Sequence, residues 1–145
     1  MLTVLATNAS RKIPAVRFFE VSKRFVAKSL PLTEQPEELP ALSLGLYGDK
    51  ESYFTLKGIV EMLFARCRME VSYRRSAESY LHPGRQAEIV YNGEKIGFLG
   101  EMHPLTAEKF GIEGRAYLAE IRLESLYTAL EGQRTFYQPL PRHPA

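Results

Sequence analysis

The sequence predicts an α+β domain, an antiparallel sheet flanked by helices, from three observations. Residues 87–91 and 95–99 alternate between apolar and polar and flank Asn92-Gly93, a pattern typical of a β-hairpin. Apolar residues recur at three- and four-residue steps over 53–66, which indicates an amphipathic helix lying on a sheet. The other strand-like segments are joined by loops or single helices, so we expect antiparallel pairing.

Composition favours one soluble globular domain over residues 1–145. The chain is 45% hydrophobic and 25% charged, and its 19 Lys and Arg against 17 Asp and Glu give a net charge of +2. This balance gives no reason to expect a broad nucleic-acid-binding face. The single cysteine, Cys67, excludes an internal disulfide. With no signal-peptide pattern and no membrane-length apolar run, we expect a cytoplasmic protein without a membrane partner.

The first residues predict a short helix followed by a strand. Apolar residues at helical spacing are Leu2, Leu5, Ala6 and Ala9. Pro14 ends this helix because proline cannot continue it. Residues 15–26 then alternate as in a strand, with Val16, Phe18 and Glu20 on one face and Arg17, Phe19 and Val21 on the other.

The middle of the chain predicts a loop, a strand and the long helix. Three prolines and several acidic residues make 28–40 read as an exposed loop. Residues 41–47 form a strand closed by Gly48. Gly58 lies inside the helix at 53–66 and costs up to ~1 kcal/mol relative to alanine, so we expect close packing of the helix on the sheet to require it.

The C-terminal half predicts alternating short elements around the hairpin. We expect strands at 69–74 and 117–121, helices at 106–110 and 124–130, and a last strand beginning at Phe136. Before the hairpin, His82-Pro83-Gly84-Arg85 predicts a type II turn with Gly84 at positive φ. After it, Pro104 can open a helix.

The motifs around this hairpin resemble a known family. They read H-P-G-R-x-A-x-I at 82–89 and I-G-x-L-G-E-x-H-P at 96–104, and similarity extends to 16–21, 54–61 and 137–145. The chain is similar to the core domain of bacterial phenylalanyl-tRNA synthetase beta subunits. The family-motif residues at structural turns are His82, Pro83, Gly84, Arg85, Gly97, Gly100, Glu101, His103 and Pro104.

The resemblance implies a fold like the core of class II aminoacyl-tRNA synthetases and a non-catalytic supporting role. In that family the alpha subunit binds ATP, magnesium and phenylalanine, the assembly is α2β2, and tRNA is met through the holoenzyme. It therefore implies no cofactor for this fragment, and the editing site lies in a different domain. The sequence begins inside a helix pattern and stops where the family continues into another strand, so we expect a fragment of a longer chain.

The residues for adenylation chemistry do not follow the class II pattern. That pattern uses Arg-x-Glu on a strand, which places both side chains on one face, but here Arg17 and Glu20 are three apart and face opposite ways. The class II pattern also has a later glycine-rich strand that ends in an arginine for ATP. Here the nearest match, the glycine-containing stretch 97–101, is followed by Met102 instead of arginine. We therefore expect no catalytic residue. Two alternatives stay open: a degenerate synthetase domain that retains nucleotide binding, and an enzyme that uses Glu101 and His103.

Other candidate sites have simpler structural explanations. Cys67, His82, Glu101, His103 and His143 lack the spacing of zinc ligands, so we expect no metal site. His82 and His103, each followed by proline, are expected to bond nearby backbone groups. Glu101 could act as a general base, but no nucleophile is identifiable beside it, so a structural glutamate is the simpler explanation. Gly97 and Gly100 fit close packing better than a phosphate cradle.

Basic residues near the N-terminus leave direct tRNA contact as a further alternative. They are Lys12, Arg17, Lys23, Arg24 and Lys28, interleaved with Phe18, Phe19 and Phe25. Charge with interleaved aromatics is typical of RNA binding, and also of an amphipathic strand with solvated basic residues. A second basic group could meet an acidic partner surface: Arg66, Arg68, Arg74 and Arg75.

Overall fold

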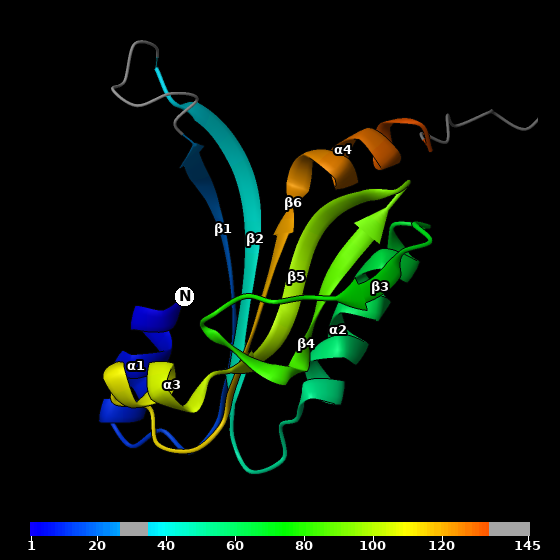
Figure 1. The fold of residues 1–145 in the computed structure, drawn as a ribbon. Helices are drawn as coiled ribbons and strands as arrows, with labels where there is room; N and C mark the ends of the chain where they lie inside the picture. Colours follow the sequence, from blue (N-terminus) through cyan, green and yellow to red (C-terminus); the bar gives the residue numbers. More distant parts are fainter. Residues whose placement is uncertain (27–34, 134–145) are drawn as a thin grey trace, which may run out of the picture.

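A computed structural model describes residues 1–26 and 35–133. Six antiparallel strands form one sheet in the order β1-β2-β6-β5-β4-β3 (Figure 1). The strands are β1 (Val16–Val26), β2 (Glu37–Tyr47), β3 (Ser72–Arg75), β4 (Leu81–Tyr91), β5 (Glu94–Met102) and β6 (Ala116–Arg122). The helices are α1 (Leu2–Ser10), α2 (Tyr53–Arg66), α3 (Pro104–Lys109) and α4 (Leu123–Glu131). The predicted α+β class with an antiparallel sheet is confirmed.

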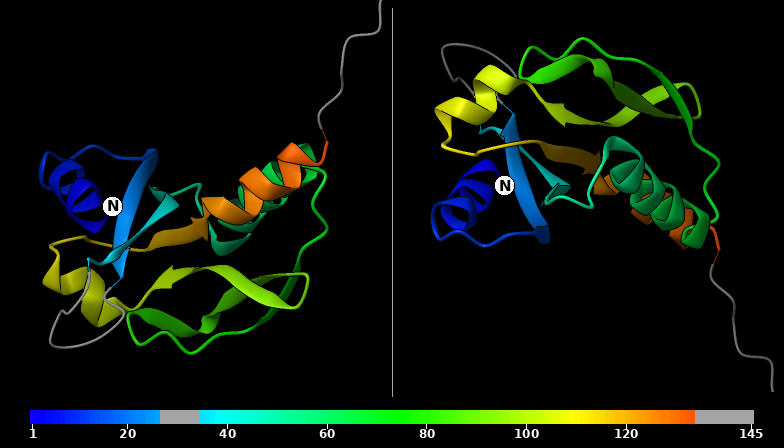
Figure 2. Two further views of the ribbon diagram at one scale, coloured as in Figure 1. Left: turned by 90° about the horizontal axis from the view of Figure 1, so that it is seen from above. Right: turned by 90° about the horizontal axis from the view of Figure 1, so that it is seen from below.

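The sheet separates two hydrophobic cores. Figure 2 shows α2 and α4 on one side of the sheet and α1 and α3 on the other. The larger core joins Leu56, Val60 and Phe64 of α2 to apolar residues of β2, β4, β5 and β6. The smaller core packs Leu5 of α1 and Ala107 of α3 against the other face. In the described residues, no helix is both long enough and apolar enough to cross a membrane.

The predicted hairpin and long helix are confirmed. Asn92 and Gly93 have φ values of 50° and 81°, as a tight turn between β4 and β5 requires. Helix α2 has the predicted bounds and begins with a capping box in which Ser52 and Thr55 exchange hydrogen bonds with each other's backbone N–H groups. The explanation for Gly58 was wrong, because a Cβ there would meet nothing within 4 Å.

The predicted turn at His82–Arg85 was also wrong. These residues continue β4, Gly84 has no positive φ, and the register with β5 shifts between Leu81 and Gln86. The Gly84 N–H donates to Nδ1 of His82 at 3.1 Å. A bulge with a local side-chain bond therefore replaces the turn.

Two strand boundaries differ from the prediction. Glu37–Pro40 belong to β2 and were wrongly predicted as loop. Proline is tolerated because this part of β2 pairs with β1 alone, since pairing with β6 begins at Ala41, so a missing N–H need not interrupt the sheet. The strand predicted at 69–74 is shorter and begins at Ser72. The strand predicted at Phe136 lies outside the described residues.

Tyr73 of β3 offers a stability test. Its hydroxyl is buried without a hydrogen-bond partner among the described residues, and burial raises its pKa to about 12. We expect Tyr73→Phe to raise the free energy of unfolding by about 1 kcal/mol, because the unpaired hydroxyl is removed. The free phenol titrates near 10. As the pH rises, the unfolded state therefore loses this proton first. The contribution of Tyr73 to the stability of the wild type decreases as the pH is raised from about 10 to about 12. Urea unfolding at both pH values checks both expectations, and unchanged stability in the variant would contradict the first.

Candidate protein-docking groove

An apolar groove lies on the α2 and α4 side of the sheet, next to β1. Its volume is about 690 Å³. The side chains that line it include Phe19, Val21, Leu44, Met62, Leu126 and Tyr127. They come from β1, β2, α2 and α4, so the fold assembles the groove from four separate segments.

The groove exposes large apolar side chains. Phe19 is 73% exposed and Met62 is 59% exposed. The reason is the position of β1 at the edge of the sheet, where it contributes no residue to the core beneath α2 and α4. A contiguous exposed apolar surface of this kind is typical of a protein interaction site.

Arg66 adds one positive charge to this lining. It lies in the last turn of α2, and no carboxylate among the described residues forms an ion pair with it. Of the other basic residues predicted to meet an acidic surface, Arg74 differs in this respect, since it bonds Glu88 at 2.6 Å. The groove therefore suits a mainly apolar partner surface that carries an acidic group near Arg66.

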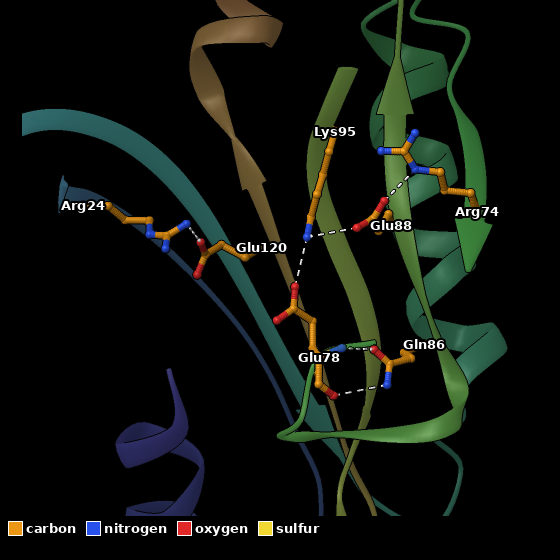
Figure 3. Close-up of polar contacts among 7 residues, drawn as sticks. All are labelled: Arg24, Arg74, Glu78, Gln86, Glu88, Lys95 and Glu120. Atoms are coloured by element: carbon orange, nitrogen blue, oxygen red, sulfur yellow. Dashed lines mark hydrogen bonds and ion pairs between the residues drawn. The ribbon is translucent and has the colours of Figure 1, made fainter. Parts of the chain in front are cut away.

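The opposite face of the sheet carries paired charges (Figure 3). Nζ of Lys95 lies 2.9 Å from a carboxylate oxygen of Glu78 and 3.2 Å from one of Glu88. The hydrogen bond from Arg74, together with Lys95, holds the pKa of Glu88 below its usual value. Glu78 raises the pKa of Lys95. Both shifts favour the charged forms, so these groups bind one another across the strands.

A nucleotide grip is not assembled from the residues that the class II pattern would use. Arg17 pairs in register with Leu46 on the α2 face, whereas Glu20 pairs with Ser43 on the other face, as predicted. Nε of Arg17 donates to Glu51 at 2.8 Å. Arg17 and Glu20 therefore cannot contact one nucleotide from the same face of the sheet. The class II pattern also uses a glycine-rich strand that ends in arginine. Sequence reasoning missed Arg122, which ends β6 directly before α4, but β6 contains no glycine and so does not match that strand.

The family motifs meet in an ion-pair cluster across β4 and β5. Glu101 is only 3% exposed, and Nη1 of Arg85 lies 3.2 and 3.0 Å from its two carboxylate oxygens. Arg115, which sequence reasoning missed, lies 3.6 Å from the same carboxylate. No spacing in the sequence signals Arg115, because the fold brings it from the turn before β6. The arrangement is that of a structural carboxylate between two guanidinium groups.

The remaining motif residues cap a helix or allow close approach of the backbone. Nδ1 of His103 accepts the N–H of Leu105 at 3.2 Å and caps α3, which Pro104 opens. A Cβ on Gly97 would lie 2.2 Å from the carbonyl oxygen of Glu120, and one on Gly100 would lie 2.9 Å from that of Arg85. These glycines therefore allow close approach of neighbouring backbone. Within 1–26 and 35–133, no three His, Cys, Asp or Glu side chains gather as metal ligands, and His143 lies outside these ranges.

The basic residues considered for tRNA contact do not form one patch. Arg24 bonds Glu120 and Lys23 bonds Glu38, at 2.5 and 2.6 Å. Arg17 faces the α2 side of the sheet and Arg24 the other. Lys12 lies in the turn after α1 at φ 56°, and Lys28 is outside the described residues. Three of the four described cations are thus already paired with a carboxylate.

Comparison with known proteins decides the family. Residues 1–123 match the family model of the phenylalanyl tRNA synthetase beta chain CLM domain. The chain belongs to this family. Phenylalanine–tRNA ligase beta subunits of Symbiobacterium thermophilum and Halalkalibacterium halodurans are each 34% identical over the whole chain, and that of Clostridium tetani is 35% identical.

This beta-chain domain spans a small part of those relatives. The match covers 17% of the Symbiobacterium protein, 19% of the Halalkalibacterium protein and 18% of the Clostridium protein. The family model also covers every element of the described structure from α1 through β6.

Proposed function

We propose that this chain is a non-catalytic scaffold domain of a phenylalanine–tRNA ligase beta subunit, with a class II-like core. In this role it binds the alpha subunit, and alpha carries out the ATP-dependent attachment of phenylalanine to tRNA. The observation that carries the proposal is the exposed apolar groove beside β1. A beta subunit implies a partner alpha subunit, and such a groove suits burial against another protein.

The charge pairing supports a binding role in preference to a reacting one. Glu101 is held between two arginines, and Arg17 and Arg24 are each held by a glutamate. Charged groups committed to one another in this way stabilise the sheet. The alternatives of retained nucleotide binding and direct tRNA contact have no comparable observation in their favour.

The test compares two exposed apolar residues of α2. Met62 lines the groove, whereas Phe54, 77% exposed, does not. We expect Met62→Glu to weaken binding of the cognate alpha subunit by roughly 30-fold, because it places a charge in an apolar interface. Phe54→Glu is expected to leave the affinity unchanged. Calorimetric titration of alpha into each variant measures both values.

Two outcomes would overturn the proposal. One is the absence of any association between the folded chain and alpha. The other is an equal loss of affinity in the two variants, since the groove then has no special part. Circular dichroism of each variant ensures that the comparison is made between folded proteins.

A further inference from the structure

The outer edge of β1 is an exposed strand edge next to the groove. Among residues 1–26 and 35–133, the sheet order places β1 at one end with β2 as its single neighbour, so within this part of the chain one side of an 11-residue strand has no strand beside it. Phe19 is 73% exposed, and Phe25, which does not line the groove, is 66% exposed. A long apolar edge strand is a template for pairing with another strand.

The sequence of β1 is complementary to itself in one register. Two copies of β1 related by a two-fold axis pair in antiparallel fashion. Because directly opposed side chains lie on the same face of the sheet, the axis must lie between the two copies of one and the same residue. With the axis at Ser22, Phe19 faces the partner's Phe25, Val21 faces the partner's Lys23, and Glu20 faces the partner's Arg24. Each pair occurs twice. Phe18 likewise faces the partner's Val26. Within one copy Arg24 also bonds Glu120 and Glu20 lies 3.6 Å from the N-terminal amine, but both side chains are about half exposed, so they can reach a second copy as well.

Neighbouring registers are less favourable. An axis at Glu20 or Lys23 places two identical charges opposite each other. An axis at Val21 brings no opposite charges together. The register centred on Ser22 combines aromatic pairs on the groove face with ion pairs on the other face, and each such pair is of the kind that stabilises sheets.

We propose that two copies of this chain associate through antiparallel β1–β1 pairing centred on Ser22, which extends the sheet across both copies. The inference does not depend on the proposed function, because backbone pairing at the strand edge requires no alpha subunit, although Phe19 takes part in both surfaces. The interface is small, so we expect a dimer with a dissociation constant in the micromolar range.

Exchange of charges between copies tests the register. Glu20→Arg creates two Arg–Arg contacts in the dimer, and Arg24→Glu creates two Glu–Glu contacts. We expect each variant alone to dimerise roughly tenfold more weakly than the wild type, from two like-charge pairs. A mixture of the two variants is expected to regain wild-type affinity, because both contacts then join opposite charges. Glu20 and Arg24 of one copy are about 13 Å apart along the strand, so this rescue requires a second copy.

Sedimentation equilibrium of the 145-residue chain over a hundredfold concentration range supplies the measurement. A wild-type chain that is monomeric throughout the micromolar range would overturn the proposal, as would a mixture that dimerises no better than its components. Arg24→Glu also breaks the bond to Glu120, so thermal unfolding must show that this variant folds. If it does not, Phe25→Ser takes its place: we expect roughly tenfold weaker dimerisation, and wild-type affinity in that variant would contradict the pairing.

Discussion

Gly97→Ala is expected to lower the free energy of unfolding by about 3 kcal/mol. A Cβ at this position would lie 2.2 Å from the carbonyl oxygen of Glu120 and 3.1 Å from Cα of Ile121. Both obstructing atoms are backbone of the adjacent strand β6, which cannot rotate aside as a side chain can. The strands must therefore separate at the centre of the sheet. Urea unfolding measures the change.

Gly58→Ala is the matched control for this prediction. A Cβ on Gly58 meets nothing within 4 Å, and the residue lies inside α2. Alanine favours a helix over glycine, so we expect this variant to be more stable by about 1 kcal/mol. Equal stability of Gly97→Ala and the wild type would show that β5 and β6 do not approach as described.

Arg85→Met is expected to destabilise the domain by about 3 kcal/mol. It removes the closer guanidinium from Glu101 and leaves a buried carboxylate with only Arg115, at 3.6 Å. A buried charge that loses its partner costs about 3–5 kcal/mol, and the remaining arginine places the expectation at the lower end. Chemical unfolding of the variant and the wild type gives the difference.

A matched arginine and a double variant test this explanation. Arg74→Met breaks an ion pair at a side chain that is 56% exposed, so its effect should not exceed about 1 kcal/mol. Adding Glu101→Leu to Arg85→Met removes the unpaired charge and should recover much of the lost stability. A double variant no more stable than Arg85→Met alone would show that the pair is not the source of the loss.

Local patterns predicted most of the fold. The hairpin follows from Asn92-Gly93 between alternating strands, and α2 follows from its spacing of apolar residues. Errors arose where tertiary pairing overrides local preference. Pro40 on its own indicates a loop, yet pairing with Lys23 of β1 makes it part of β2. His82 bonds the Gly84 backbone, and a bulge forms where the sequence indicates a turn.

The candidate site was less accessible to sequence reasoning. The residues around the hairpin carried the family resemblance, but their ion-pair cluster includes Arg115, which is distant along the chain and has no motif of its own. The groove combines residues as far apart as Phe19 and Tyr127. Its exposure depends on the position of β1 at the edge of the sheet, outside the core beneath α2 and α4, which the pattern within each segment does not reveal.

Hydrogen–deuterium exchange of this chain with and without the cognate alpha subunit tests the scaffold proposal most directly. We expect alpha to slow exchange in the groove, at Phe19, in the second half of α2 and at the start of α4. The hairpin of β4 and β5 is expected to exchange at its original rate. Protection of the charged face around Lys95, with no change along the groove, would contradict the proposal.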